Sequence, residues 1–189
     1  MREKYPTIVS IVSCCLNVGS NNFSTTCIIT GRCRGDSLMT TLPLLTVDTV
    51  VEYVRELRLF PSDDSLAATE VTDGTLNFAF RVTGLISSVF IKQTPGFIKV
   101  LGPTAKLSNH RLHIERGAYA EWEKALTSSE PEALACLPHI LHFGEDRMIM
   151  TMEDLSSHVL LQDQLISGVV GAVVARKVGY FLGCVHGSL

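Results

Sequence analysis

The sequence predicts an α+β domain in which an antiparallel sheet with a helix precedes a mainly helical segment. An alternating strand follows the turn Asp73-Gly74, an apolar run ends on Lys92, and another apolar run ends in the polar stretch Met152 to Ser156. Short apolar runs bounded by turns are typical of strands, and apolar residues at three- and four-residue steps indicate helices. With 189 residues, of which 46% are hydrophobic, the chain can bury a core.

The charge and the apolar runs exclude two classes of partner. The chain has 16 basic and 19 acidic residues, whereas a nucleic-acid-binding domain carries a basic face. A membrane span needs roughly 18 to 20 apolar residues, and the nearest run, Leu165 to Val185, is interrupted by Arg176 and Lys177. We therefore expect a cytoplasmic protein that binds neither nucleic acid nor membrane.

The cysteines indicate free thiols in a reducing compartment. Four of the six, Cys14, Cys15, Cys27 and Cys33, lie near the N-terminus, and no Cys-x-x-Cys pair occurs. A zinc site needs paired ligands at short fixed spacing, so we assign no metal ligand. Residues 1–41 show neither helical nor strand periodicity, and we expect an irregular extension there.

The first regular element is a helix that follows Thr46. This threonine can cap the helix, and Asp48 occupies its second position. The apolar residues recur on one face: Val47, Val50, Val51, Val54 and Leu57. We expect the helix to close at Phe60-Pro61, because proline disfavours helical geometry in the residue before it.

Three strands should follow this helix. The strand Ala68 to Val71 leads into the Asp-Gly pair, a dipeptide suited to a tight turn. Residues Leu76 to Arg81 then alternate, so the next strand has one apolar face and carries Asn77 on the other. The strand Val89 to Gln93 returns antiparallel to it, which places Lys92 near the turn.

The second half of the chain adds helices and a strand pair. The residues from His110 to Leu126 follow the helical period, and this helix should cross the sheet. Pro138 to Phe143 and Met148 to Met152 should pair around a turn. A last helix is expected from Gly168 to Val185. We expect the apolar stripe of this helix to stay partly exposed to solvent. The stripe consists of Val169, Val170, Val173, Val174, Val178, Phe181 and Leu182.

Two interpretations of Lys92 remain open from the residues alone. It is either a solvated charge where a strand reaches the surface, or a ligand for the phosphates of a nucleotide. Glu115, in the first half of the predicted helix, could orient it, although Glu121 and Glu123 on the same helix are solvated alternatives. The polar stretch after Met152 could offer backbone groups to a flat heterocycle, or could be an ordinary loop with Asp154 or Ser156 as a cap.

Four segments together carry a family resemblance. The runs Glu70 to Phe78, Ile91 to Gln93, Met152 to Ser156 and Leu165 to Gly168 resemble S-methyl-5-thioribose kinase. That family has a protein-kinase-like fold, shared with choline and aminoglycoside kinases. The resemblance extends over roughly Leu42 to His186. It implies an antiparallel N-terminal lobe at residues 42–155, followed by the first helices of a C-terminal lobe at 156–189.

The resemblance also implies roles for individual residues. Asn77 and Lys92 would contact the phosphates of ATP, and Glu115 would support Lys92. The linker Glu153-Asp154-Leu155 would bind adenine through its backbone. The reaction would transfer the γ-phosphoryl group of ATP to the anomeric hydroxyl of methylthioribose, with Mg²⁺ as cofactor. The partners are then ATP and a small sugar, and the family is compatible with a homodimer.

The sequence departs from the family pattern at three places. Thr75 replaces the usual asparagine of the Asp-Gly turn, and Gly102 to Lys106 replaces a Gly-Glu-Ser-Trp-Pro run. The family continues past the position of Leu189 into a lobe with the catalytic aspartate and the metal-binding acids. We therefore assign no catalytic residue, and we expect the chain alone to lack phosphotransferase activity. The alternatives are a noncatalytic ATP-binding fragment and a kinase for choline, homoserine or an aminoglycoside.

Overall fold

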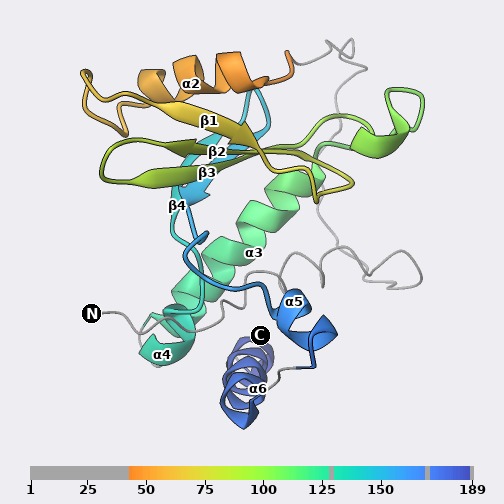
Figure 1. The fold of residues 1–189 in the computed structure, drawn as a ribbon. Coiled ribbons are helices and arrows are strands. Elements are labelled where there is room, and N and C mark those ends of the chain that lie inside the picture. The colour runs from red at the N-terminus through yellow and green to blue at the C-terminus, as the bar shows by residue number, and fades with distance from the viewer. Residues whose placement is uncertain (1–42, 128–129, 169–170, 188–189) are drawn as a thin grey trace.

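The computed structural model describes residues 43–127, 130–168 and 171–187. Its centre is a five-stranded antiparallel sheet with the strand order β1-β2-β3-β5-β4. Helix α2 lies on one face of the sheet, helix α3 crosses the other face, and α4, α5 and α6 lie beyond α3 (Figure 1). The predicted α+β class is confirmed. The expectations for residues 1–41, including their cysteines, lie outside the described residues.

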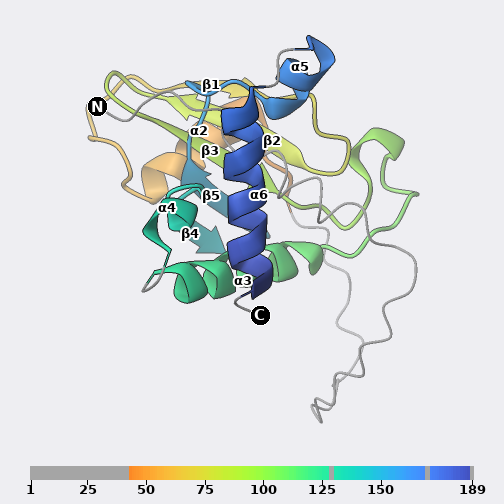
Figure 2. The same cartoon turned by 90° about the horizontal axis from the view of Figure 1, so that it is seen from below.

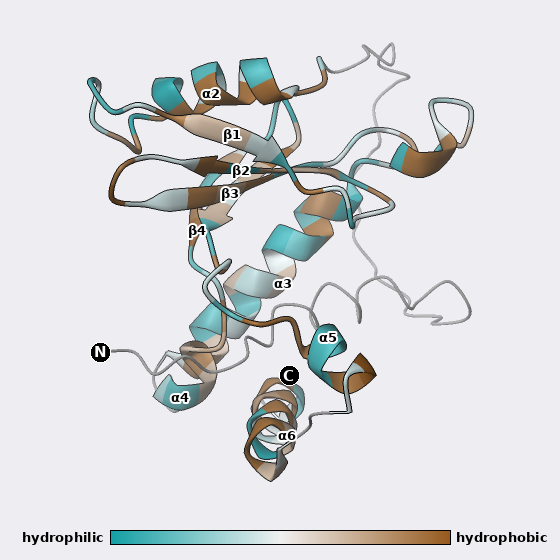
Figure 3. Ribbon diagram, viewed as in Figure 1, coloured by the Kyte–Doolittle hydropathy of each residue, from teal (hydrophilic) through white to brown (hydrophobic). Residues whose placement is uncertain are grey.

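Helix α2 (Val47–Glu56) begins as the sequence predicts and ends earlier. The Thr46 side chain accepts a hydrogen bond from the Thr49 amide, and the Thr49 side chain accepts one from the Thr46 amide. The predicted end at Phe60-Pro61 is wrong, because Arg58 adopts a left-handed backbone conformation with φ 54° and stops the helix first. The apolar side of α2 faces the sheet (Figure 3).

Strands β1 (Ala67–Glu70), β2 (Phe78–Thr83) and β3 (Ser88–Gln93) form the predicted antiparallel order. In the register of β2 with β3, Ala79 lies opposite Lys92. The strand after the turn begins at Phe78 and not at Leu76, so Asn77 lies in the turn segment just before β2. The Arg111 side chain donates to the Leu76 carbonyl and to the Asn77 side chain, so the Leu76 carbonyl has its partner outside the sheet.

The second half contains the predicted elements and three short ones that the sequence did not predict. The predicted ones are α3 (Arg111–Leu126), β4 (Ile140–Gly144), β5 (Ile149–Glu153) and α6 (Ala172–Gly187). The short ones are the 3₁₀ helix η1 (Lys99–Leu101), α4 (Pro131–Leu134) and α5 (Leu161–Ile166). These elements contain too few residues to show a helical period in the sequence. None of the helices in the described segments is long and apolar enough to span a bilayer.

The two faces of the sheet belong to two separate cores. On the α2 side, Val50 and Val54 pack with Val89, Ile91 and other apolar strand residues. On the α3 side, Leu112, Tyr119 and Leu126 pack with strand and α6 residues such as Met150 and Phe181. Alternation along β3 and β5 produces this division, because successive side chains point to opposite faces.

Helix α6 lies below the sheet in the view of Figure 1 and therefore in front of it in Figure 2, and it contacts α3. Phe181 is 1% exposed and Val185 is 4% exposed, so this part of the helix belongs to the core. The expectation of an open stripe is therefore wrong at Phe181, whereas Val173 near the start of α6 is 52% exposed. Val169 and Val170 lie outside the described residues. Helices α3 and α4 cover the C-terminal part of α6 and account for the difference.

Gln93 connects both sides of the α2 core through its amide group. Gln93 is 1% exposed, and its Oε1 accepts a hydrogen bond from the Leu45 amide at 2.7 Å. Its Nε2 donates to the carbonyls of Pro43 at 2.9 Å and Arg147 at 3.2 Å. One buried side chain thus holds the segment before α2 against the β4–β5 turn.

Gln93→Met is expected to destabilise the protein by about 2 to 4 kcal/mol, because it removes three hydrogen bonds and leaves buried backbone groups unpaired. Chemical denaturation monitored by circular dichroism measures this change. The matched control is Gln162→Met on α5, where the glutamine is exposed and a change within about 0.5 kcal/mol is expected. Equal stability of the two variants would contradict the assigned role of Gln93.

Candidate functional site

An ion pair between the sheet and helix α3 forms the centre of the candidate site. Lys92 Nζ on β3 lies 2.7 Å from Glu115 Oε1 and 2.6 Å from Oε2. The two side chains are 13% and 12% exposed. Alternation places Lys92 on the α3 face of the sheet, and Glu115 lies in the second turn of α3. The predicted contact between these residues is present.

The pairing restrains the lysine without using all of its donors. An ammonium group has three N–H donors, and the two oxygens of Glu115 take two of them. The ion pair, largely buried between sheet and helix, keeps the ammonium group next to Glu115. The arrangement can therefore hold one further acceptor at a fixed position next to β3.

Asn77 is held by a residue that the sequence did not single out. Its Oδ1 accepts a hydrogen bond from Arg111 Nη2 at 3.0 Å. Asn77 precedes Ala79, the residue opposite Lys92, by two positions in the chain. Arg111 is the first residue of α3, and an arginine at a helix start carries no sequence signal for such a contact. The structure thus brings Asn77 and Lys92 to the same end of the β2–β3 hairpin.

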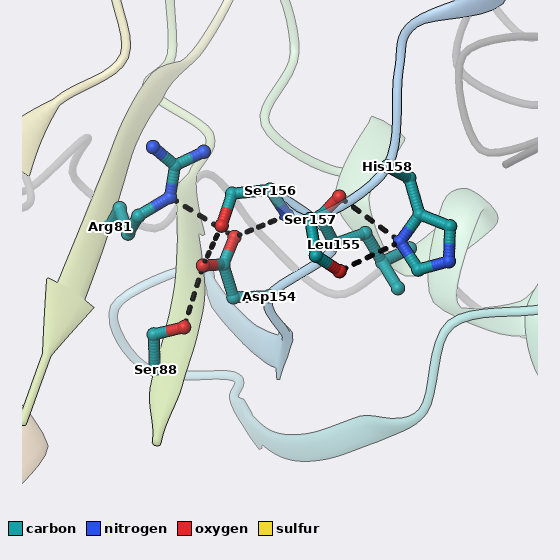
Figure 4. Close-up of polar contacts among 7 residues, drawn as sticks. All are labelled: Arg81, Ser88, Asp154, Leu155, Ser156, Ser157 and His158. Carbon is teal, nitrogen blue, oxygen red and sulfur yellow. Dashed lines mark hydrogen bonds and ion pairs between the residues drawn. The ribbon is translucent and has the colours of Figure 1, made fainter. Parts of the chain in front are cut away.

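The linker after β5 is fastened by the side chain of Asp154 (Figure 4). This side chain is 2% exposed. It accepts hydrogen bonds from Arg81 Nε at 3.1 Å, from Ser88 Oγ at 2.6 Å, and from both the amide and the hydroxyl of Ser156. Asp154 therefore ties the linker to β2 and β3. The sequence pointed to the backbone of Asp154 or to a local cap by its side chain, and the bonds of this side chain to Arg81 and Ser88 were not predicted.

Main-chain groups on either side of Asp154 differ in their partners. The Glu153 amide donates to the His139 carbonyl at 2.9 Å, and the Leu155 carbonyl accepts from the His158 amide at 2.9 Å. His158 Nδ1 also lies 3.3 Å from that carbonyl (Figure 4). Within the described segments, the Leu155 amide donates to no protein acceptor. The linker thus has a fixed path and one main-chain donor that is available to a ligand.

A cavity of about 600 Å³ lies between α3 and β4, with none of the predicted site residues in its lining. Its walls come from the helix residues His113 and Arg116, from β4, and from Glu145. Arg116 lies over the Phe143 ring at 5.6 Å. The predicted residues lie elsewhere. Asn77, Lys92 and Glu115 lie at the end of β2 and β3 near the turn, and the linker residues 153–155 lie at the opposite end of β3. No role for the cavity follows from these contacts.

The described residues contain no group of three or more histidine, cysteine, aspartate or glutamate side chains placed to hold a metal ion. We therefore assign Mg²⁺ to no side chain in these segments. The acidic residues nearest the candidate site, Glu115 and Asp154, both have protein partners.

The chain is similar to methylthioribose kinases. It is 31% identical over 137 residues to that enzyme of Exiguobacterium sibiricum, which is 72% of this chain and 33% of the relative. It is 30% identical over 138 residues to the Bacillus thuringiensis subsp. konkukian enzyme, which is 73% of this chain and 33% of that relative.

A third relative, from Enterobacter sp. (strain 638), is also named methylthioribose kinase. It is 29% identical over 140 residues, which is 72% of this chain and 33% of the relative. The chain thus spans about a third of the length of these curated relatives. No protein-family model matches the chain.

The pKa of Asp154 predicts how the stability of the linker depends on pH. Burial alone would raise this pKa, but hydrogen bonds from Ser156, Ser88 and Arg81, with the charge of Arg81, lower it below its ordinary value. A carboxyl group with a lowered folded pKa stabilises the protein fully above its unfolded pKa of about 4. This stabilisation is lost as the pH falls through the folded pKa.

Asp154→Asn is therefore expected to cost about 1.5 to 3 kcal/mol at pH 7, because it removes charge-assisted hydrogen bonds. The difference from the native chain should begin to narrow below about pH 4, where the carboxyl group of the unfolded chain becomes protonated, and should vanish as the pH falls through the lowered folded pKa. Urea denaturation at pH 7, 5 and 3.5 measures the loss of stability and its dependence on pH. The control Asp63→Asn, at an exposed turn residue, should show neither effect. A pH-independent difference would contradict the assignment.

Proposed function

We propose that residues 42–155 form the nucleotide-binding lobe of a small-molecule kinase and that residues 156–189 begin a helical second lobe. The observation that carries this proposal is the ion pair of Lys92 with Glu115, which lies near the turn before β2, while the fastened linker lies at the other end of β3. The similarity to methylthioribose kinases over 72% of the chain supports it. We further propose methylthioribose as the phosphoryl acceptor and ATP as the donor.

The adenine and the phosphates of ATP would bind to different residues of the site. Adenine would bind the linker Glu153-Asp154-Leu155 through main-chain groups, including the Leu155 amide. The phosphates would extend toward Lys92 and Asn77. Phosphate oxygens only accept hydrogen bonds, and both of these side chains can donate to them.

The ion pair suits phosphate binding for an electrostatic reason. A lone ammonium between a sheet and a helix would pay a desolvation cost, and Glu115 offsets it before ATP binds. The ammonium then needs no rearrangement to meet the phosphates, which favours tight and oriented binding. Mg²⁺ bound to the phosphates would neutralise further charge in the transfer.

Lys92→Met is expected to weaken ATP binding about tenfold to a hundredfold, because a charge-assisted hydrogen bond contributes about 1.5 to 3 kcal/mol. Adenosine binding should be almost unchanged, since adenosine has no phosphate and contacts only the linker. Isothermal titration calorimetry of the full chain with each ligand measures both affinities.

Lys124→Met is the matched control, because Lys124 is an exposed lysine of α3 and its loss should affect neither ligand. Equal losses of ATP and adenosine affinity in Lys92→Met would indicate damage to the hairpin. Unchanged ATP affinity would remove Lys92 from the site and would restore the interpretation of a solvated strand end.

The acceptor is tested with a chimera in which this chain replaces the matched third of the Exiguobacterium sibiricum methylthioribose kinase. We expect the chimera to phosphorylate methylthioribose in the presence of ATP and Mg²⁺, and the Lys92→Met version to be at least about tenfold slower. Phosphate transfer is measured with radiolabelled ATP. A folded chimera that binds ATP and never transfers phosphate would favour the noncatalytic ATP-binding alternative.

A further inference from the structure

The Arg111 side chain joins the loop between β3 and α3 to the turn before β2 through five hydrogen bonds. Its Nη1 donates to three carbonyls that bracket the loop between β3 and α3. The acceptors are Pro95 at 3.0 Å, Leu107 at 3.3 Å and Ser108 at 2.7 Å. Its Nη2 donates across to the turn before β2, where it meets the Leu76 carbonyl at 3.2 Å and Asn77 Oδ1 at 3.0 Å.

The position of this arginine is unfavourable for the helix that carries it. Arg111 is the first residue of α3, and a cation at a helix N-terminus opposes the helix dipole. Burial lowers the pKa of Arg111, and the charge of Glu115, one turn further along α3, acts in the opposite direction. The hydrogen bonds to the two loops compensate for this placement. These contacts, and not a preference for helix formation, explain why an arginine occupies this position.

The contact with Asn77 determines which way its amide group faces. A guanidinium group only donates hydrogen bonds, so the atom that meets Arg111 must be the oxygen of the amide. The NH₂ group of Asn77 is therefore directed away from Arg111. An NH₂ group offers two donors and no acceptor, which suits an anion such as a phosphate.

We propose that Arg111 is a positioning residue that acts through Asn77 and sets its NH₂ group as a donor to the nucleotide phosphates. Because Arg111 and Glu115 lie on the same helix, one rigid element places both the lysine partner and the support of the turn. The β3–α3 loop contributes as well, since the Val100 amide donates to the Thr75 carbonyl at 3.2 Å in the same turn. This inference rests on the proposed binding of ATP.

A double-mutant cycle tests the proposal in the full chain. Arg111→Lys keeps the charge and loses the fork of donors, so ATP affinity should fall about tenfold while adenosine affinity stays unchanged. Asn77→Ala should cost about as much. If Arg111 acts through Asn77, the double variant should also lose about tenfold and not about a hundredfold. Calorimetric titration with ATP and with adenosine gives all the values.

The control for the helix is Arg116→Lys, the same substitution at an exposed arginine that contacts Phe143 and not the turn. It should change neither affinity. Adenosine binding and the denaturation midpoint report whether each variant is folded.

Asn77→Asp tests the orientation of the amide without removing Arg111. Aspartate keeps an oxygen for the guanidinium group, so the protein should be at least as stable as the native chain. It replaces the donors with a negative oxygen, so ATP affinity should fall more than in Asn77→Ala, with adenosine unaffected.

The outcomes separate this inference from the proposed function. Selective ATP loss with a non-additive cycle supports the positioning role of Arg111. If the native chain binds ATP and the losses are additive, or Asn77→Asp binds ATP as well as the native chain does, the inference is overturned and the proposed function stands. If the native chain binds adenosine and ATP equally or binds neither, the proposed phosphate site is overturned, and the inference falls with it.

Discussion

A charged side chain on the inner face of a sheet needs a counter-charge, and the pair Lys92–Glu115 meets this constraint between β3 and α3. Lys92 shares its face with the apolar core that contains Met150 and Met152. An ammonium without a partner there would be strongly disfavoured. Helix α3 must therefore present Glu115 at the level of Lys92, which fixes how far the helix is translated along the sheet. The same register brings Arg111, one turn earlier, to the turn before β2.

The end of β3 carries polar groups into both cores. Lys92 points to α3 and Gln93 points to α2, because neighbouring residues of a strand face opposite ways. Each is satisfied by a segment distant in sequence: Glu115 for the lysine, and the main chain at Leu45, Pro43 and Arg147 for the glutamine. Buried polar groups with complete hydrogen bonds favour one arrangement of the chain over its alternatives. Strand β3 thus holds the layers together by polar as well as apolar contacts.

Periodicity was sufficient to predict most elements, and it failed where long-range polar contacts decide the local conformation. The cap at Thr46, the hairpin around Gly84 and the helix beginning near His110 follow from local signals. The sequence predicted that β2 starts at Leu76, but β2 starts at Phe78. The Leu76 carbonyl and the Asn77 side chain bond to Arg111, a residue remote in sequence. For the candidate site, resemblance selected Glu115 over Glu121 and Glu123, and the contact with Lys92 is present. The side-chain function of Asp154 has no periodic signature, since its partners Arg81 and Ser88 are remote in sequence.

The two ends of the proposed nucleotide site are supported by different sets of contacts. Asp154 fastens the linker to β2 and β3 at one end of these strands. Arg111 and Glu115 support the turn and the lysine at the other end, and both belong to α3. Among the residues that the structure describes, no side chain takes part in both sets. A shift of α3 would therefore move the groups that hold Lys92 and Asn77 and leave the linker in place, so in the proposed site the phosphate contacts can change independently of the adenine contacts.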